Sequence, residues 1–419
     1  MTGPELSLLV VNYNSWRLCV EALASFAQHA PRRADGTPMP YEAIVVDNAS
    51  PLRDPAAERE LAAACAATGG RLVLHHENGG YSTGMNLARS HARGRWLVVS
   101  NPDIRYLPNT ITPLIRAMER DATIGAAAPR NYWDDGREAI LPPNILPTLL
   151  DLLWLTASEL SQKVVRAYSR RRCRAAFRVW SATGDVELPM LSGCCFVMRS
   201  EHVDRLGFFD ERFPLYFEDT DLSMRIRRAR LRIVQVAGAE VVHYFDRSGQ
   251  TANELKMERY WRSRRLYYRK WYGPLGAMVY DLTRRVLGSA WAKRRSKRVP
   301  HRHVIDLGAG HGRPLLRLPG RYERFLVELC LDPKFFLAGG IFGSGDAWSP
   351  GDAMFAGFGP TTYWFRVVDA TRPSLDEIAV FRWQQLFPAV GLPHGPEADA
   401  VGKQKLAEYH ALQHGRAGG

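Results

Sequence analysis

The first 130 residues alternate between two patterns of hydrophobic positions. Short apolar runs rich in β-branched residues occur at 6–11, 43–46, 71–74, 96–99 and 124–128. The stretches between them carry apolar residues at helical spacing, at 16–29, 54–68, 82–93 and 109–120. Alternating short strands and amphipathic helices are typical of a parallel sheet covered by helices on both faces. Ligands bind such sheets at the carboxyl ends of the strands, so functional side chains are expected directly after the strands.

Further along, the pattern becomes helical and basic over 149–180, which predicts a helical insertion. Strand-like runs return at 188–199 and 239–243, so the first domain is predicted to cover residues 1–253. Residues 254–302 are dense in Arg, Tyr and Trp and predict basic amphipathic helices followed by a charged linker.

The last part of the chain has a different character. Short β-like runs interrupted by Gly, Pro and Asp occur at 303–307, 323–330 and 362–368. They predict a small antiparallel β-sandwich over 303–391, followed by a polar, flexible tail at 392–419. The sequence VIDLGAGHG, which begins at Val304, is like the first motif of a methyltransferase. That fold needs many more alternating strands and helices than the remaining chain supplies, so we exclude it.

Length and composition limit the classes of protein that fit. A chain of 419 residues, 46% of them hydrophobic, can form two domains with sizeable cores. A formal net charge of +13 favours anionic partners, whether phosphorylated substrates, anionic lipid or nucleic acid. Six cysteines without paired spacing favour a reducing cytoplasm. The N-terminus does not resemble a signal peptide, and no apolar run reaches the ~18–20 residues of a membrane span, so a soluble or peripheral protein is expected.

Polar residues and glycines follow four of the predicted strands. An Asp or Asn at an early strand end can bind a nucleobase or ribose, although most such residues are helix caps or turn formers. Glycines before a helix let the backbone approach a ligand, and the helix N-terminus favours a diphosphate. A carboxylate after a strongly apolar strand can bind Mg²⁺ or Mn²⁺, or it can form an ordinary Pro-Asp turn. These strand-end residues are Val11, Asn12, Tyr13, Asp47, Asn78, Gly79, Tyr81, Gly84, Asn86, Asn101 and Asp103.

A second group of candidates lies near the end of the first domain. Three carboxylates, Glu218, Asp219 and Asp221, fall within four residues and follow the aromatic Phe217. Clustered carboxylates in a partly apolar setting repel one another and raise at least one pKa, which suits a general base; the alternative is a solvated, acidic helix start. Further candidates flank this cluster, namely Gly193, Cys194, His243 and Arg247.

Taken in this order, the motifs resemble the family 2 glycosyltransferases over about residues 5–250. The resemblance implies an α/β GT-A nucleotide-diphospho-sugar transferase fold, to which the C-terminal β-sandwich is added. It implies that Asp47 contacts the base, that Asp103 and His243 bind Mn²⁺ or Mg²⁺, and that Arg247 touches the diphosphate. The remaining strand-end residues would line the nucleotide-sugar site. Asn101 replaces the first Asp of the family's Asp-x-Asp signature, a variant that recurs in the rhamnosyltransferase-like branch.

The same resemblance assigns roles around the acidic cluster. Asp219 would deprotonate the acceptor hydroxyl, with Glu218 and Asp221 as supports and Gly193, Cys194 and Phe217 on the acceptor side. One in-line displacement would then transfer the sugar with inversion. The implied donor is dTDP-rhamnose, with UDP-hexose or UDP-galactofuranose as alternatives, and the implied acceptor is a glycan or a polyprenyl-diphosphate-linked sugar. The alternative from another class is a catalytically silent glycan-binding or scaffold protein, which Asn101 favours.

The excess of basic residues is concentrated in the clusters 163–178, 256–270 and 284–303. Basic amphipathic helices with interleaved Trp and Tyr commonly lie on anionic membrane surfaces, and plain solvated helix faces are the alternative. No nucleic-acid recognition motif accompanies these runs, so nucleic acid is not expected as a partner. We therefore expect a cytoplasmic protein attached peripherally to the inner face of the plasma membrane. The C-terminal part loosely resembles a fibronectin type III or Ig-like module, on the stretches ERFLVELCLDP and GPTTYWFRVVDA.

Overall fold

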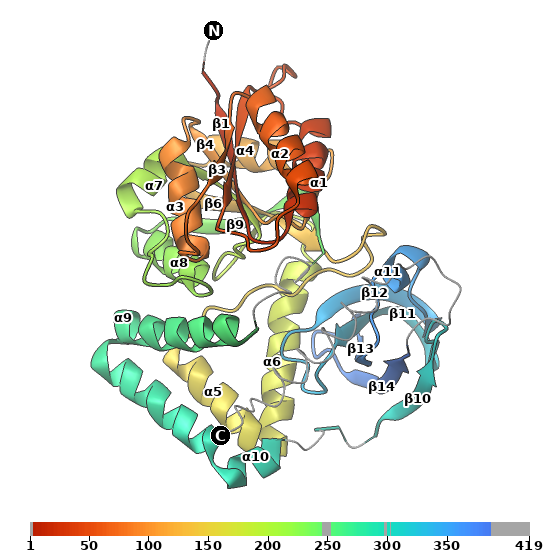
Figure 1. Cartoon of the computed structure of the whole chain (residues 1–419). Coiled ribbons are helices and arrows are strands. Elements are labelled where there is room, and N and C mark those ends of the chain that lie inside the picture. Colours follow the sequence, from red (N-terminus) through yellow and green to blue (C-terminus); the bar gives the residue numbers. More distant parts are fainter. Residues whose placement is uncertain (1–2, 245–252, 297–299, 302, 387–419) are drawn as a thin grey trace. The chain divides into compact units, whose positions relative to one another are not determined.

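The computed structural model describes residues 3–244, 253–296, 300–301 and 303–386, without the side chains of 253–256. These residues form two compact units (Figure 1). The first contains the described residues up to 132, residues 143–149 and the described part of 181–282. The second contains residues 133–142, 150–180 and the described part of the chain from 283 onward. The helical segment 150–180, which we expected as an insertion in the first domain, thus groups with the C-terminal strands.

The first unit is built on a nine-stranded mixed sheet. Its order is β3-β2-β1-β4-β8-β6-β9-β5, and β7 pairs with β9 beside this path. The strands β1 to β4 form a parallel block, whereas β8 runs antiparallel to β4 and β5 runs antiparallel to β9. The strands are β1 (Leu6–Asn12), β2 (Tyr41–Asp47), β3 (Arg71–Leu74), β4 (Trp96–Ser100), β5 (Ile104–Tyr106), β6 (Ile124–Tyr132), β7 (Val186–Glu187), β8 (Cys195–Arg199) and β9 (Arg232–His243).

Helices cover both faces of this sheet, as the alternating pattern predicted. Leu8 and Val10 of β1 share one buried apolar cluster with Trp16 of α1, Leu61 of α2 and Leu114 of α4. The helices α3, α7 and α8 lie against the opposite face (Figure 1). The helices are α1 (Trp16–Gln28), α2 (Pro55–Ala67), α3 (Tyr81–His91), α4 (Ile111–Arg120), α7 (Ser200–Leu206) and α8 (Glu218–Arg228).

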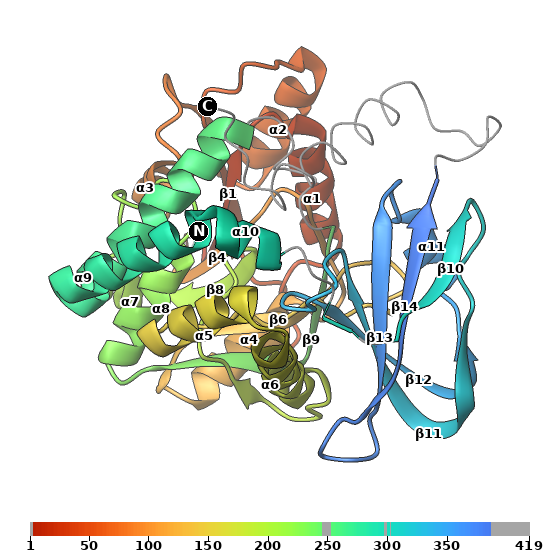
Figure 2. The same ribbon diagram turned by 90° about the horizontal axis from the view of Figure 1, so that it is seen from below.

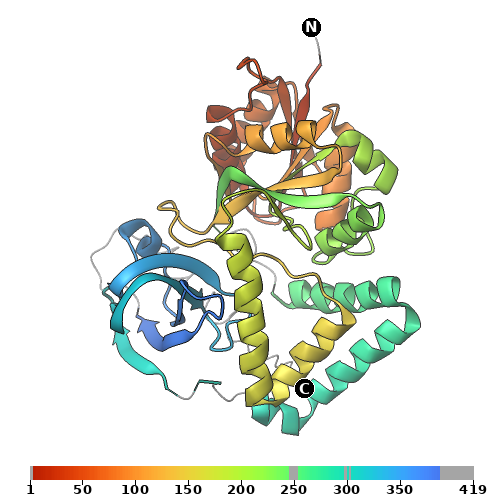
Figure 3. The same ribbon diagram turned by 180° about the vertical axis from the view of Figure 1, so that it is seen from behind.

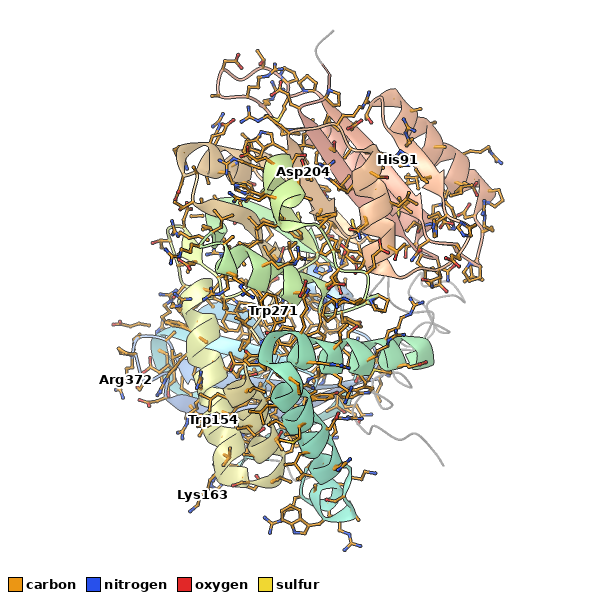
Figure 4. The ribbon with its side chains drawn as sticks, turned by 90° about the vertical axis from the view of Figure 1, so that its left-hand side faces the viewer. His91, Trp154, Lys163, Asp204, Trp271 and Arg372 are labelled. Carbon is orange, nitrogen blue, oxygen red and sulfur yellow. The ribbon has the colours of Figure 1, made fainter. Side chains whose placement is uncertain are left out.

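The long helix α9 (Asn253–Gly288) has two arms. They meet at Gly273, whose φ of 68° and ψ of −165° are not helical, and Pro274 opens the second arm. Proline suits this position because the first turn of a helix leaves its backbone N–H groups without helical partners. Figure 3 shows the bend between the arms, and Trp271, labelled in Figure 4, lies where the first arm ends.

The second unit contains one curved, five-stranded sheet with the order β10-β14-β13-β11-β12 (Figure 2). β10 is parallel to β14, the other pairs are antiparallel, and register shifts interrupt the pairing of β11 with β12. Arg366 on β13 pairs with Glu328 and donates to Ser169 of α6, both at 2.6 Å. Its elements are α5 (Leu149–Leu160), α6 (Gln162–Trp180), α10 (Ala290–Ser296), β10 (Ile305–Gly310), β11 (Leu316–Cys330), β12 (Gly339–Trp348), α11 (Asp352–Ala356), β13 (Thr362–Asp369) and β14 (Glu377–Gln385).

The predicted fold class is confirmed, because a helix-covered α/β sheet is joined to a separate C-terminal β unit. The run 188–199 is a strand only from Cys195, because residues 188–194 form turns and irregular backbone. The VIDLGAGHG segment lies on β10, which is an edge strand of the second sheet. The likeness of this unit to an Ig-like module stays a prediction, and the tail 392–419 is outside the described residues. Among the helices that the structure describes, none has the length and apolarity to cross a membrane.

Candidate active site

Asp47 lies at the carboxyl end of β2 in a hydrogen-bonded cluster. Asn12, at the end of the neighbouring strand β1, donates its side-chain amide to Oδ1 of Asp47 at 2.8 Å. Ser50 donates its hydroxyl to the same oxygen at 2.5 Å and its backbone N–H to Oδ2 at 3.1 Å. The parallel pairing of Asn12 with Asp47 brings these side chains together. Both carboxylate oxygens of Asp47 therefore have donors within the protein.

Asn78 connects three segments of the first unit. Its side-chain oxygen accepts hydrogen bonds from Nδ2 of Asn48 and from the backbone N–H of Gly80, both at 3.1 Å. Arg259, on the first arm of α9, donates to the same oxygen at 3.2 Å and to the backbone carbonyl of Asn78 at 3.1 Å. The loop before α3 is thus fixed both to the end of β2 and to α9.

Two glycines of this loop and helix are required by close packing. Gly80 has a φ of +90°, and a Cβ there would lie 2.3 Å from the carbonyl oxygen of Pro214. A Cβ on Gly84 would lie 2.9 Å from a methyl group of Val11 on β1. Any larger residue would push α3 away from the sheet edge at which Asn12 and Asp47 lie. A Cβ on Gly79 would meet its own neighbour Thr83 at 2.8 Å.

The helix α3 also fixes the segment that precedes the acidic cluster. The backbone N–H of Tyr81 donates to Pro214 at 2.6 Å, and the side chain of Asn86 exchanges two hydrogen bonds with the backbone of Phe209. The hydroxyl of Tyr81 donates to the carbonyl of Gly193 at 3.2 Å. Tyr81 therefore links the loop of Asn78 to the surroundings of Asp219.

Asp103 and His243 meet because β5 pairs antiparallel with the end of β9. Ile104 is opposite His243 in this pairing, and the backbone of Tyr244 donates to that of Asp103 at 3.1 Å. Nε2 of His243 is 3.4 Å from Oδ1 of Asp103, and both residues are buried. Burial alone would lower the pKa of His243, but Cys194 and Asp103 raise it to about 10. The pair therefore holds a proton unless a cation takes its place.

This pair fits part of the coordination shell of a divalent cation. Two cis ligands of an octahedral ion with bonds of ~2.1 Å are about 3 Å apart, close to the separation of the two donor atoms. The described residues include no cluster of three or more His, Cys, Asp or Glu side chains able to hold a metal. A cation here would take its other ligands from water and from a phosphorylated substrate.

The acidic cluster opens helix α8 after a strained segment. Tyr216 and Phe217 are consecutive non-glycine residues with positive φ, 63° and 68°. Such left-handed backbone costs energy and is concentrated at functional sites. Glu218 and Asp219 follow directly in the first turn of α8, where the helix dipole favours a negative charge.

The carboxyl groups of Glu218 and Asp219 differ in the hydrogen bonds that their oxygens accept. Oδ1 of Asp219 accepts the N–H of Thr220 at 2.7 Å, and Oδ2 accepts the N–H of Gly193 at 3.1 Å. Glu218 is buried, and its Oε2 has no hydrogen-bond partner among the residues that the structure describes. Of the two carboxyl groups, Asp219 is therefore the better stabilised as an anion.

The pKa values of this cluster follow from its burial. Burial raises the pKa of Glu218 well above its ordinary value, and the neighbouring Asp219 raises it further. Burial also raises the pKa of Asp219, against the hydrogen bonds from Thr220 and Gly193 that lower it. Tyr81 has its pKa raised by burial and by both carboxyl groups, so its hydroxyl stays neutral. Glu218 is the member of the pair that holds a proton more tightly.

Asp221 has different surroundings from its two neighbours. Arg225 pairs with its Oδ2 at 2.9 Å, while Lys270 and the indole N–H of Trp271 approach its Oδ1 at 2.6 and 2.9 Å. Lys270 also pairs with Asp210 at 2.8 Å. Asp221 thus joins α8 to the first arm of α9 through a buried ion-pair network. The supporting role that the sequence analysis assigns to Asp221 stays a prediction.

The remaining predicted residues lie in or near these clusters. Cys194 is buried beside His243 and its backbone carbonyl accepts the N–H of Asn101 at 2.8 Å. Tyr13 is half-buried and its backbone carbonyl accepts the hydroxyl of Ser15 at 3.1 Å. Phe217 is buried, 5.7 Å from Tyr260 between ring centroids. Arg247 lies outside the described residues.

Sequence reasoning missed Arg259 and Lys270, which reach Asn78 and Asp221 from α9. Both belong to a segment, RYWRSRRLYYRKWY, in which basic residues occur at almost every turn. Helical spacing alone does not distinguish a basic side chain that points into the site from one that points to solvent. Only the position of the arm relative to α3 and α8 distinguishes them.

Comparison with known proteins agrees with this arrangement. The sequence model of the family described as "Glycosyl transferase family 2" matches residues 7–207, which contain Asp47, Asn78 and Asp103 but not His243 or Arg259. These residues form a family 2 glycosyltransferase domain. The resemblance inferred from the strand-end motifs is thereby confirmed. The acidic cluster on α8 begins at Glu218, beyond the matched region.

Curated relatives match part of the chain. It is 30% identical over 151 residues to an N-acetylglucosaminyl-diphospho-decaprenol L-rhamnosyltransferase of Mycobacterium tuberculosis, an alignment that covers 36% of this chain and 47% of the relative. It is 32% identical over 91 residues to the O-antigen biosynthesis protein RfbC of Myxococcus xanthus, covering 22% and 7%. The chain thus spans about half the length of the mycobacterial glycosyltransferase and a small part of RfbC.

Solved structures of glycosyltransferases are more distant. A mannosyltransferase of Pyrobaculum calidifontis, solved with GDP-Man and Mn²⁺, is 18% identical, with a TM-score of 0.43 over 71% of this chain and 74% of that one. GalNAc-T7, solved with UDP, GalNAc and Mn²⁺, is 14% identical, with a TM-score of 0.41 over 58% and 44%. Similarity of this degree carries no inference about the ligands of this chain.

Proposed function

We propose that the chain is an inverting, metal-dependent glycosyltransferase that moves a sugar from a nucleotide diphosphate to a hydroxyl group. The observation that carries this proposal is the Glu218–Asp219 pair, which follows the family 2 domain of residues 7–207 in the same structural unit. One carboxyl group is stabilised as an anion and the other is buried with a strongly raised pKa. Such a pair, joined through Tyr81 to the loop of Asn78, suits proton removal beside a bound donor.

In this proposal Asp219 is the general base. The N–H groups of Gly193 and Thr220 keep it ionised and orient it, while its raised pKa makes it a stronger base than an exposed aspartate. Burial and the neighbouring Asp219 raise the pKa of Glu218 well above its ordinary value, which favours its neutral form and so limits the negative charge of the cluster. Asp219 would accept the proton of the acceptor hydroxyl as its oxygen attacks the anomeric carbon in line with the departing diphosphate. A single displacement inverts the configuration and requires no covalent sugar–enzyme intermediate.

On the donor side, Asp103 and His243 would hold the metal, Mn²⁺ or Mg²⁺. A bound cation would neutralise the charge that develops on the departing diphosphate. Asn12, Asp47 and Ser50 would hold the nucleoside at the ends of β1 and β2. Asn78, fixed by Asn48 and Arg259, would position the loop over the donor.

The proposed donor sugar is L-rhamnose from dTDP-rhamnose. Support comes from the mycobacterial relative, whose name describes an L-rhamnosyltransferase acting on a diphospho-decaprenol-linked sugar. A UDP-hexose or UDP-galactofuranose is the alternative donor for the same chemistry. We propose a glycan or a lipid-diphosphate-linked sugar as acceptor, in polysaccharide biosynthesis at the cytoplasmic face of the membrane.

Nucleotide release from a panel of sugar donors, with and without Mn²⁺ or Mg²⁺, tests the proposal. We expect one donor to be turned over, only with metal, and the Asp103→Ala variant to be inactive. The matched control is Glu119→Gln, which changes an exposed carboxylate on α4 and should behave as the wild type. If calorimetry detects no nucleotide-sugar binding and no donor is turned over, the alternative of a silent glycan-binding protein, which Asn101 favours, replaces this proposal.

A further inference from the structure

The second arm of α9 has large aliphatic side chains on its outer face. Leu275, Met278 and Leu282 are 59%, 61% and 59% exposed. Their spacing of three and four residues places them on one side of the helix. Contiguous apolar side chains on an exposed helix face mark an interaction surface more often than isolated exposed residues do. We call these three residues the α9 apolar face.

The opposite side of this arm is firmly packed. Tyr280 is buried and stacks on Tyr268 of the first arm, with ring centroids 5.6 Å apart. Arg265 of the first arm makes an ion pair with Asp281 at 2.8 Å. The arm is therefore held in one rotation about its axis, and this rotation keeps the α9 apolar face outward.

The surroundings of this face are strongly basic. Between residues 257 and 296 the sequence has eleven Lys and Arg but only two acidic residues, Glu258 and Asp281. Asp281 is already paired with Arg265. Arg262, Arg269 and Arg285 are exposed and, among the described residues, have no carboxylate within ion-pair distance. Arg285 follows Leu282 by three residues on the same arm, whereas Arg262 and Arg269 belong to the first arm. An apolar stripe on a helix with unneutralised cations is typical of the interface of an anionic membrane.

We propose that Leu275, Met278 and Leu282 insert into the interfacial region of an anionic lipid bilayer, with the flanking arginines on the lipid headgroups. The inference rests on the proposed function, since a lipid-linked acceptor would have to be reached at a membrane. It goes further by naming the surface that docks. A second copy of the chain is a poorer occupant, because two such faces would bring like charges together.

Co-sedimentation with phosphatidylcholine vesicles, with and without phosphatidylglycerol, tests the surface on the full chain. We compare the wild type with L275Q/M278Q/L282Q and with the control L52Q/L74Q, which changes two exposed leucines of other elements, 61% and 49% exposed. The wild type and the control should bind the anionic vesicles. The triple variant should bind them at least about tenfold more weakly than the wild type. R262Q/R269Q should also bind about tenfold more weakly, with a reduced dependence on salt. Because all substituted side chains are exposed, circular dichroism spectra should not change.

Three results would overturn the inference. The first is a wild type that does not bind anionic vesicles, and the second is a triple variant that binds them as the wild type does. The third is a wild type that dimerises in sedimentation velocity, with a triple variant that loses the dimer but keeps vesicle binding. Donor turnover with a water-soluble acceptor is measured on the same proteins and should not differ between them. Its absence in all of them, with vesicle binding as expected, would refute the proposed function and leave the docking surface in place.

Discussion

Two carboxylate clusters of the first unit, at Asp47 and at Glu218–Asp219, differ in the hydrogen bonds that their oxygens accept. At Asp47, Asn12 and Ser50 supply donors to both oxygens, and the group is a fixed part of the sheet edge. At Glu218–Asp219, one carboxyl group receives backbone N–H donors while Oε2 of the other has no partner among the described residues. Non-glycine residues with positive φ occur at both clusters, Ala49 beside Asp47 and Tyr216 and Phe217 before Glu218, so the difference lies in the hydrogen bonds.

The difference indicates which carboxylate stabilises the fold and which is available for chemistry. A fully bonded carboxylate contributes to stability through the hydrogen bonds that it accepts. A buried pair with an unpartnered oxygen and raised pKa values costs stability and is retained where proton transfer is useful. The sequence alone does not show this difference, because Asp47 and the Glu218–Asp219 pair both appear there only as acidic residues next to a predicted strand or helix.

The largest expected effect comes from Asp219→Asn. The amide keeps the shape of the side chain but cannot accept the proton, so kcat should fall by about 10³-fold. Affinity for the nucleotide should stay within about twofold, because the change is confined to the proton acceptor. Single-turnover kinetics and nucleotide titration measure the two quantities. Near-normal transfer with intact donor binding would mean that Asp219 is not the base.

The next effect concerns the Asp103–His243 pair, which would bind a cation instead of a proton. Asp103→Ala, or removal of divalent metal by a chelator, should lower turnover by about 10²-fold or more. Added Mn²⁺ should restore the chelated wild type but not the variant. Turnover that is insensitive to the chelator would contradict the proposed metal site.

The strands β1, β2, β4 and β6 could be predicted from the sequence, because they are buried and read as continuous apolar runs. The short strands β5 and β7 and the first part of β9 were not predicted. The strand ends then located Asn12, Asp47 and Asp103 without any tertiary information. The meeting of Asp103 with His243 was expected only from the family resemblance. It depends on the antiparallel β5–β9 pairing, which periodicity cannot predict because β5 is three residues long.

Contacts made by α9 could not be predicted in the same way. The hydrogen bonds of Arg259 to Asn78 join residues 181 positions apart, and they depend on where the helix lies. The grouping of 150–180 with the C-terminal strands is also a tertiary property. Its ties include the buried contact of Ser169 with Arg366, two residues that are unremarkable in the sequence.

A smaller effect is expected at Asp47, where stability should change more than chemistry. Asp47→Asn replaces an acceptor with a donor that faces the hydrogens of Asn12 and Ser50. The free energy of unfolding should fall by about 1–3 kcal/mol, measured by denaturant titration, while kcat stays within about threefold. The matched control is Asp346→Asn, which changes an exposed aspartate of β12 and should leave stability unchanged.

The smallest effect is the pH dependence contributed by Glu218. Its folded pKa is raised well above the ordinary value of 4.5, so above that pH the unfolded chain loses a proton that the folded chain keeps. The contribution of Glu218 to stability is therefore full below about pH 4.5 and falls as pH rises towards the folded pKa. Glu218→Gln should be more stable than the wild type at neutral pH by about 1 kcal/mol. Thermal unfolding at several pH values should detect this gain, and its persistence at pH values below 4.5 would contradict the assigned direction.

The most direct test measures kcat and the unfolding free energy on Asp47→Asn and Asp219→Asn side by side. The account predicts different kinetic results: Asp47→Asn should lose stability and keep its chemical step, whereas Asp219→Asn should lose its chemical step. Both variants place an amide NH2 group against a hydrogen-bond donor, so some loss of stability is expected in each. If Asp219→Asn unfolds more easily while its kcat is unchanged, the acidic cluster is structural and the proposed catalytic role of Asp219 is wrong.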